Sequence, residues 1–343
     1  MRAVVLVGGL GTRLRPLTLR TPKQMLPVAG RPMIEWVVEH LAGHGVDEVV
    51  LSLGYRPDAF RRAYPDATCA GVRLVYAVED EPLDTAGAIR FAAGAVGVDE
   101  RFLVVNGDIL SDLDVSALLA FHADAHEQAG ALATIGLVPV EDPSAYGVVT
   151  TDGEGKVQAF VEKPAPGDAA SHDINAGCYV LEPEVLDRIP GTGRVNIERE
   201  TFPALVAEGR LWALSQHGWW VDVGTPERYL QASLELLDKG AGQGEAGLVD
   251  HSAVVASSAV VTRSVLGPGC RIGRNARVRD SVVFSRAVVG NGATISGSIV
   301  GASAVVGDAA SVSGLSVLGN EVEVDGGATL EAAVLPDPGT WPA

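Results

Sequence analysis

The chain has 343 residues, of which 47% are hydrophobic, and it carries a formal net charge of −17. This length exceeds one ordinary hydrophobic core and predicts two domains. The negative charge argues against nucleic acid or an anionic membrane as a partner, since both select basic surfaces. Three widely separated cysteines form neither a zinc pattern nor an even disulfide set, and no apolar run is long enough for a signal-peptide core or a membrane span. We therefore expect a cytoplasmic protein that meets anionic ligands with local cations.

The first 140 residues alternate short apolar runs with longer helical patterns. Strands are expected at 3–7, 48–53, 73–77, 102–106 and 131–137, and helices at 32–43, 57–64, 86–95 and 115–124. Continuous Val, Leu and Ile strands separated by helices indicate a parallel sheet covered on both faces, an α/β domain of the dinucleotide-binding class. Further strands are expected near 147–151, 157–162, 175–181 and 211–215, with a helix around 198–207. Thr225 and Pro226 then predict the N-cap and first turn of a helix that ends near Leu237.

The sequence changes character after a Gly-rich linker at 238–247. Aliphatic residues recur at a period of six, with two skipped residues, at Leu248, Val254, Val260, Leu266, Ile272, Val278, Val283, Val289, Ile295, Val300, Val306, Val312, Leu318, Val324 and Leu330. This period is neither helical nor the alternation of a strand, and it resembles the hexapeptide repeat of left-handed parallel β-helices, with the aliphatic side chains inside. Fifteen hexads predict five coils over 248–335. Because such solenoids often pack against copies of themselves, we expect a homo-oligomer, the alternative being a stabilising platform within one chain.

The first strand leads into a segment rich in glycine and cations. Gly8-Gly9-Leu10-Gly11-Thr12-Arg13-Leu14 is followed by Pro22-Lys23. Glycines let backbone N–H groups approach phosphate oxygens, and Arg13 and Lys23 can neutralise their charge. The segment is neither a Walker loop nor a dinucleotide fingerprint. It predicts a triphosphate site, unless the Gly-rich turn serves packing alone.

Two aspartates are candidate metal ligands. Asp108 follows the strand 102–106, at the edge of the sheet where doubly wound proteins bind ligands, so a Mg²⁺ ligand is expected there. The alternative is a turn aspartate that caps the following helix. Asp222 lies among the aromatic and apolar residues of 218–226, where a carboxylate is costly unless it is paired or binds a metal.

These segments resemble the sugar-1-phosphate nucleotidylyltransferases, whose signature runs Gly-Gly-x-Gly-Thr-Arg-Leu-x-Pro-Leu-Thr, then Pro-Lys. The resemblance implies a Rossmann-like (GT-A-like) nucleotidyltransferase domain over 1–237 and a β-helix over 248–335. It implies that Arg13, Lys23, Asp108 and Asp222 act in catalysis, with Mg²⁺ on the two aspartates. The implied nucleotide site comprises Leu6, Gly8, Gly9, Gly11, Thr12, Arg13, Lys23, Glu79, Pro82, Asp84, Thr85 and Gly87. The implied sugar-phosphate site comprises Gly107, Tyr146, Gly147, Glu162, Lys163 and Asn175.

The run from Glu79 to Gly87 resembles the Glu-Pro-Leu-Gly-Thr-Ala-Gly motif of mannose-1-phosphate guanylyltransferases, except that Asp84 replaces a glycine. Aspartate tolerates the left-handed backbone better than most residues, so the turn can persist. Guanine presents two adjacent donors, which the carboxylate of Glu79 can accept, although the run could also be a surface acidic cluster. We therefore expect GTP and mannose-1-phosphate as substrates and GDP-mannose as product.

The implied reaction is attack by a sugar-1-phosphate oxygen on the α-phosphorus of the triphosphate, which expels pyrophosphate. The nucleophile is already ionised, so positioning and charge neutralisation should dominate catalysis. Lys163 would orient the incoming phosphate, Arg13 would hold the pyrophosphate and Lys23 would stabilise the α-phosphorus.

Four other functions remain open at this stage. They are a thymidylyl or other nucleotidylyl transferase acting on glucose-1-phosphate, a guanylyltransferase for a valienol-type cyclitol phosphate, an inert assembly subunit, and an acyltransferase. The last needs a histidine base, and His251 is the only histidine in the repeat region.

Overall fold

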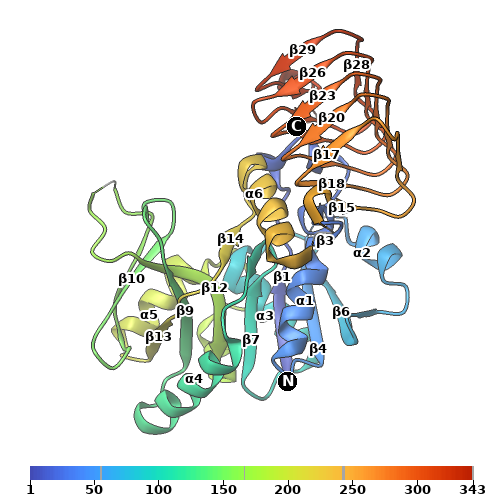
Figure 1. Ribbon diagram of the computed structural model, residues 1–343. Helices are drawn as coiled ribbons and strands as arrows, with labels where there is room; N and C mark the ends of the chain where they lie inside the picture. Colours follow the sequence, from blue (N-terminus) through green and yellow to red (C-terminus); the bar gives the residue numbers. More distant parts are fainter. Residues whose placement is uncertain (55, 166, 242–243, 342–343) are drawn as a thin grey trace. The chain divides into compact units, whose positions relative to one another are not determined.

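The computed structural model describes residues 1–54, 56–165, 167–241 and 244–341 (Figure 1). The chain divides into two compact units, each built from two stretches of sequence. The first unit comprises Met1–Gly9 and Ile34–Val221, and the second comprises Leu10–Met33 and Asp222–Ala343. Most of the glycine-rich signature segment thus belongs to the same compact unit as the C-terminal repeats.

The centre of the first unit is a parallel sheet of four strands. Its members are β7 (Phe102–Asn106), β1 (Arg2–Leu6), β4 (Glu48–Leu53) and β6 (Val72–Val78), in that order, with the short strand β5 (Thr68–Cys69) antiparallel at the edge. Val4, Val50 and Val104 are buried on these strands. The parallel pairing of these four strands confirms the predicted arrangement, because strands buried on both faces have continuous aliphatic sequences.

Helices connect these strands. They are α1 (Met33–Gly43), α2 (Pro57–Ala63), α3 (Asp84–Val96) and α4 (Val115–Ala129). The side chain of Asp114 caps α4 by accepting a hydrogen bond from the backbone N–H of Ala117. No helix in the described parts of the chain is long and apolar enough to cross a bilayer.

The rest of the sheet is mostly antiparallel, with β13 (Leu211–Ser215) pairing parallel with β9 (Ala133–Pro139) as the exception, and its strand order differs from the predicted one. Strand β12 (Asp173–Leu181) pairs antiparallel with β7 and also with β9, so β9 does not extend the parallel sheet directly. Three further strands complete this part of the sheet: β10 (Gly147–Thr151), β11 (Val157–Glu162) and β13. The direction of β9 is as predicted, but β12, from later in the chain, lies between β7 and β9, because a continuous apolar run indicates burial on both faces without indicating which strand is its neighbour.

Shorter elements complete the first unit. A two-stranded sheet joins β8 (Ile109–Ser111) to β14 (Trp220–Asp222). A short helix, η4 (Pro183–Arg188), precedes a π-helical turn, η5 (Ile197–Thr201), which continues into α5 (Phe202–Ala207).

The second unit begins with the short helices η1 (Thr12–Leu14), η2 (Leu17–Leu19) and η3 (Lys23–Met25) and the hairpin of β2 (Pro27–Val28) and β3 (Arg31–Pro32). Helix α6 (Pro226–Leu236) starts as predicted, with the Thr225 hydroxyl accepting from the N–H of Arg228. It is followed by η6 (Leu237–Ala241) and η7 (Gly244–Ala246). Residues 242 and 243 of the predicted linker lie outside the described residues.

The repeats form three parallel sheets, consistent with the left-handed β-helix that the hexapeptide period predicts. The first sheet holds β15 (Gly247–Val249), β18 (Ser264–Leu266), β21 (Val282–Val283), β24 (Ile299–Val300), β27 (Val317–Leu318) and β30 (Val334–Leu335). The second holds β16 (Val254–Val255), β19 (Arg271–Ile272), β22 (Val288–Val289), β25 (Val305–Val306) and β28 (Glu323–Val324). The third holds β17 (Val260–Thr262), β20 (Arg277–Arg279), β23 (Thr294–Ser296), β26 (Ser311–Ser313) and β29 (Thr329–Glu331), which stack on one another in Figure 1. A last short helix, η8, covers Pro338–Thr340.

The interior of the β-helix is filled by one aliphatic side chain per strand, and the predicted interior positions are correct from Leu266 onward. They are wrong in the first coil, where Val254 and Val260 are 62% and 53% exposed and Val255 and Val261 contact the core instead. The interior residues Val261 and Leu266 are five residues apart, and the adjacent aliphatic residues at 254–255 and 260–261 hide this third shortened repeat in the sequence. The same holds for the pair at 248 and 249, of which the second contacts the core.

A column of buried serines stands at one corner of the coils, formed by Ser264, Ser281, Ser298 and Ser316. The N–H of Ser281 donates to the Ser264 hydroxyl at 3.2 Å, and the N–H of Ser298 donates to the Ser281 hydroxyl at 3.1 Å. The two skipped residues fall beside Ser281 and Ser298. The serine hydroxyls therefore satisfy backbone groups at the corners where the repeat is shorter.

Candidate active site

Glycine at position 11 lets two parts of the signature segment approach each other. Gly11 has a φ of 60°, and a Cβ atom there would lie 3.1 Å from Cγ2 of Thr18 and 3.3 Å from Cβ of Lys23. The Thr18 hydroxyl donates to the Gly11 carbonyl at 2.7 Å, and Leu14 is fully buried. The loop that follows β1 is thus closed onto the turn that carries Lys23.

Three of the predicted catalytic side chains meet around Gly224 in the second unit. The ammonium of Lys23 lies 3.9 Å from Oδ1 of Asp222, and the Lys23 side chain is only 8% exposed. A Cβ atom on Gly224 would lie 3.1 Å from Nη2 of Arg13 and 3.1 Å from Oδ1 of Asp222. A buried ammonium is costly without a nearby carboxylate, and Asp222 supplies one. Gly224 was not among the predicted site residues, although it lies two residues after Asp222 in the segment 218–226.

Asp108 follows β7 in the first unit, as predicted. The preceding residue, Gly107, donates its N–H to the carbonyl of Leu6 at 2.9 Å. A Cβ atom at Gly107 would lie 2.8 Å from that carbonyl oxygen, so only glycine lets the chain turn so close to β1. The turn leaves Asp108 half-buried at the carboxyl end of the parallel strands. Leu6 and Gly107, predicted for the nucleotide and sugar-phosphate sites, are therefore direct neighbours.

The predicted nucleotide loop is held in place by hydrogen bonds through its acidic residues. The carboxylate of Glu79 accepts from the Ser52 hydroxyl at 2.8 Å and from the N–H of Leu83 at 3.2 Å. Asp84 has a φ of 60°, so the turn accommodates aspartate in the left-handed conformation. Oδ1 of Asp84 accepts from the Asn196 amide at 3.0 Å, a bond that glycine could not make.

A cavity of about 630 Å³ opens beside this loop, within the first unit. Glu79, Leu83 and Gly87 line it, together with Phe91 of α3 and the loop 190–193. Phe91 is 40% exposed there. The nucleotide loop therefore borders open space large enough for a small ligand.

Five of the six predicted sugar-phosphate residues lie on or directly beside β10, β11 and β12, whereas Gly107 follows β7. Gly147 stands opposite Glu162 in the sheet, and the N–H of Lys163 donates to the carbonyl of Tyr146 at 3.0 Å. The Lys163 ammonium lies 3.3 Å from Oε1 of Glu162, while its side chain stays 61% exposed. Such a lysine can reach an incoming phosphate.

Asn175 links this group of residues to a carboxylate that the sequence did not reveal. The amide of Asn175, on β12, donates to Oε1 of Glu198 at 2.7 Å. Glu198 lies in η5, where burial and the nearby carboxylate of Glu162 raise its pKa. In the sequence the only signal was the capping residue Asn196 before an apolar helical run.

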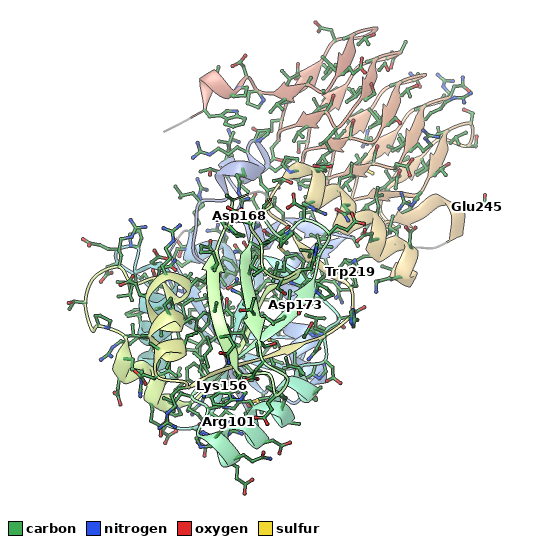
Figure 2. All side chains as sticks on the ribbon, turned by 90° about the vertical axis from the view of Figure 1, so that its left-hand side faces the viewer. Arg101, Lys156, Asp168, Asp173, Trp219 and Glu245 are labelled. Atoms are coloured by element: carbon green, nitrogen blue, oxygen red, sulfur yellow. The ribbon has the colours of Figure 1, made fainter. Side chains whose placement is uncertain are left out.

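Elsewhere in the first unit, His122, His126 and Glu182 lie close enough together to resemble a metal site. The Glu182 carboxylate is already paired with a guanidinium, because Arg101 (labelled in Figure 2) donates to Oε1 of Glu182 at 2.5 and 2.7 Å. His122 is also bonded on both sides, to Thr134 at 2.7 Å and to Glu182 at 3.0 Å. We therefore describe this cluster as a buried hydrogen-bond network.

Comparison with known proteins agrees with this arrangement. The chain matches the nucleotidyl transferase family over residues 2–239 and the GMPPB C-terminal domain over residues 244–338. The mannose-1-phosphate guanylyltransferase of Mycobacterium tuberculosis (strain ATCC 25618 / H37Rv) is 40% identical over 82% of this chain and 79% of that protein. Mannose-1-phosphate guanylyltransferase 1 of Arabidopsis thaliana is 37% identical over 84% and 79%. The fold and the signature segment define a nucleotidyltransferase, and the chain belongs to the family of the mannose-1-phosphate guanylyltransferases.

Solved structures show the same catalytic fold. HddC from Yersinia pseudotuberculosis is 28% identical, with a TM-score of 0.58 over 68% of this chain and 99% of that one, and it has also been solved in complex with GMP-PN. A putative glucose-1-phosphate thymidylyltransferase from Bacillus anthracis is 26% identical, with a TM-score of 0.59 over 68% and 94%. Enzymes of this family generally use a divalent metal ion.

Proposed function

We propose that the chain transfers a guanylyl group from GTP to mannose-1-phosphate, giving GDP-mannose and pyrophosphate. The observation that carries the proposal is the meeting of Arg13, Lys23 and Asp222 around Gly224. Two cations and a carboxylate held together by a glycine-rich loop suit a triphosphate better than a neutral ligand. The names of the curated relatives supply the choice of sugar.

The nucleotide would bind through the signature segment and the loop 79–87. A Cβ atom built on Gly8 or Gly9 would meet no heavy atom of the described residues within 4 Å, so this part of the loop borders open space, where its backbone N–H groups would bind phosphate oxygens. Glu79, held by Ser52 and Leu83, would accept the two donors on the guanine edge. Thymine and uracil present a single N–H donor between two carbonyl oxygens, and the carboxylate of Glu79 would repel those oxygens.

The sugar phosphate would bind at Gly147, Glu162 and Lys163. The ammonium of Lys163 would hold the phosphate, and Glu162 would accept hydrogen bonds from ring hydroxyls. The attacking phosphate oxygen is already ionised, so alignment with the α-phosphorus and charge neutralisation would carry the rate. Arg13 would bind the departing pyrophosphate, and Lys23 would balance the charge that develops at the α-phosphorus.

Asp108 and Asp222 would hold Mg²⁺. Both side chains supply carboxylate oxygens, the ligands that this ion prefers, and both are only partly buried, so a partly hydrated ion can reach them. When bound, Mg²⁺ draws charge from the phosphate oxygens. The role of the protein would be to orient the two carboxylates.

The test is pyrophosphate release with Mg²⁺, measured over a panel of nucleoside triphosphates and of mannose-, glucose- and valienol-type phosphates. GTP with mannose-1-phosphate is expected to give the highest kcat/KM. A higher value for another pair would replace the substrate assignment. No release with any pair would overturn the enzyme proposal and favour an assembly subunit.

Replacing Asp108 by Asn should lower kcat by about 100-fold or more, because the neutral amide is a far weaker Mg²⁺ ligand. Thermal unfolding should be unchanged, since Asp108 is not in the core. Asp58→Asn, at an exposed aspartate on α2, is the matched control and should keep full activity. Unchanged activity of Asp108→Asn would remove this residue from the metal site.

We also propose that the protein forms homo-oligomers through its β-helix. Val254, Val260 and Val305 are exposed aliphatic residues on the second and third sheets, a surface suited to association. A cytoplasmic location would fit the three cysteines, which are all free. Light scattering of the purified protein tests the first point, and a monomer at micromolar concentration would contradict it.

A further inference from the structure

We infer that Glu198 contacts the sugar directly and that Asn175 acts by positioning it. The carboxylate of Glu198 would accept hydrogen bonds from neighbouring hydroxyls of a hexose phosphate, beside Glu162. This inference rests on the proposed function and deepens it by assigning a residue that sets the preference for the sugar.

The hydrogen bonds of Asn175 are the first step of the argument. Its two amide hydrogens go to the Tyr179 hydroxyl at 2.9 Å and to Oε1 of Glu198 at 2.7 Å, and its Oδ1 accepts from the N–H of Gly177 at 2.9 Å. The residue is only 7% exposed. Asn175 therefore has no donor left for a sugar hydroxyl. The group that it holds in place beside the predicted sugar-phosphate residues is the carboxylate of Glu198.

The second step is that Glu198 and Glu162 together offer more hydrogen-bond acceptors than the neighbouring residues use. Oε2 of Glu198 makes no hydrogen bond within the described parts of the chain, and the carboxylate of Glu162 lies close enough to repel it. Among the described residues, the cations that act on Glu198 are Lys163 and Arg199, and the Lys163 ammonium is needed for the phosphate. Two partly buried carboxylates with unused lone pairs favour a ligand rich in O–H donors. A hexose phosphate, with hydroxyls on adjacent ring carbons, is such a ligand.

The third step is the rigidity with which Glu198 is held. The side chain of Asn196 caps η5 by accepting from the N–H groups of Glu198 and Arg199. The same side chain donates to Asp84, and the N–H of Ile197 donates to the Thr85 hydroxyl at 2.9 Å. Glu198 is thus fixed to the nucleotide loop before any substrate binds, as a group that selects among ligands must be.

The experiment compares Glu198→Gln with Glu200→Gln in steady-state kinetics. Glutamine at 198 keeps an oxygen for the Asn175 bond but removes the charge. We expect the KM for mannose-1-phosphate to rise about tenfold and the KM for GTP to stay within about twofold. Glu200 is exposed and accepts only from the N–H of Asn196, which glutamine can also do, so its variant should match the wild type.

A second readout is independent of turnover. In calorimetric titrations, Glu198→Gln should lose about tenfold in affinity for GDP-mannose and keep the wild-type affinity for GDP. Asn175→Ala should lower the affinity for GDP-mannose in the same way. The double variant should bind GDP-mannose no more weakly than either single variant, because the two residues would act as one unit.

The outcomes separate this inference from the proposed function. If the wild type is active but Glu198→Gln keeps its KM for the sugar phosphate and its affinity for GDP-mannose, Glu198 does not contact the sugar. An equal loss of GDP and GDP-mannose binding would show a purely structural role and would also overturn the inference. If the wild type itself releases no pyrophosphate, the proposed function is at fault instead.

Discussion

At the scale of single residues, the absence of a side chain at Gly224 matters as much as the charges around it. Gly224→Ala would place a methyl group 3.1 Å from both Nη2 of Arg13 and Oδ1 of Asp222, so both groups would have to move by a few tenths of an ångström. The φ of Gly224 is not in the left-handed region, so the backbone itself tolerates alanine. We expect kcat to fall roughly tenfold or more, because misplaced charged groups lose most of their effect on the transition state. Measuring kcat together with the urea unfolding midpoint tests this.

Gly43→Ala is the control, because a Cβ atom there meets no heavy atom of the described residues within 4 Å. It should leave kcat and stability close to the wild type. Full activity of Gly224→Ala would show that Arg13 and Asp222 do not need their present spacing.

At the scale of secondary-structure elements, a buried histidine network joins α4 to β9 and to the end of β12. His122 is fully buried, and burial lowers its pKa to about 4, although Glu182 opposes the shift and Arg101 and His126 add to it. As the pH falls through 6.5, His122 therefore binds a proton in the unfolded chain but not in the folded chain. Stability contributed by neutral His122 is present above pH 6.5 and is lost as the pH falls toward 4.

We expect the free energy of unfolding to fall by about 2 kcal/mol between pH 7 and pH 5 from this group alone. In that range Glu182 adds little, because hydrogen bonds from Arg101 and His122 overcome the burial penalty and keep its pKa below the usual value. His122→Gln can keep both hydrogen bonds and should flatten the dependence in urea titrations at several pH values. His251→Gln, at an exposed residue, should keep the wild-type slope. Identical slopes for all three proteins would contradict the assignment.

At the scale of the whole chain, the second unit joins distant stretches of sequence around one buried tyrosine. The hydroxyl of Tyr229, on α6, donates to the carbonyl of Pro27, four residues after Lys23, and its ring lies 6.1 Å from that of Phe284 in the β-helix. Leu248, in the first coil of the β-helix, packs against Gly30 in the hairpin of β2 and β3, which also contains Pro27. Arg20 forms an ion pair with Glu321 of the β-helix at 2.8 Å. The β-helix therefore supports the segment that carries Lys23, besides any role in assembly.

Tyr229→Phe should lower the free energy of unfolding by about 1–2 kcal/mol, because the carbonyl of Pro27 loses a buried partner. It should also raise the KM for GTP, since the turn that carries Lys23 loses one of its anchors. Tyr64→Phe removes a comparable hydrogen bond, to Glu35 at 3.1 Å, in the first unit. This control should lose stability but keep the KM for GTP, and equal KM values for both variants would contradict the anchoring role of Tyr229.

The sequence by itself predicted the elements and the family because those depend on residues that are consecutive or regularly spaced. Aliphatic runs predicted the four parallel strands, Thr225 and Pro226 predicted the start of α6, and the period of six predicted the β-helix. The glycines and cations from Gly8 to Lys23 predicted a triphosphate site, and the resemblance of this segment to a family signature predicted the class of reaction.

Only the tertiary structure decided features that depend on which distant residues touch. It placed β12 antiparallel beside β7, chose Val255 over Val254 for the interior of the β-helix, and set Gly224 between Arg13 and Asp222. It also brought Glu198 to Asn175, across a distance in sequence that no local pattern spans. Local sequence records whether a side chain is buried and which backbone shape it tolerates. Its partners are selected by the packing of the whole chain, as the contacts of Gly224 and Glu198 show.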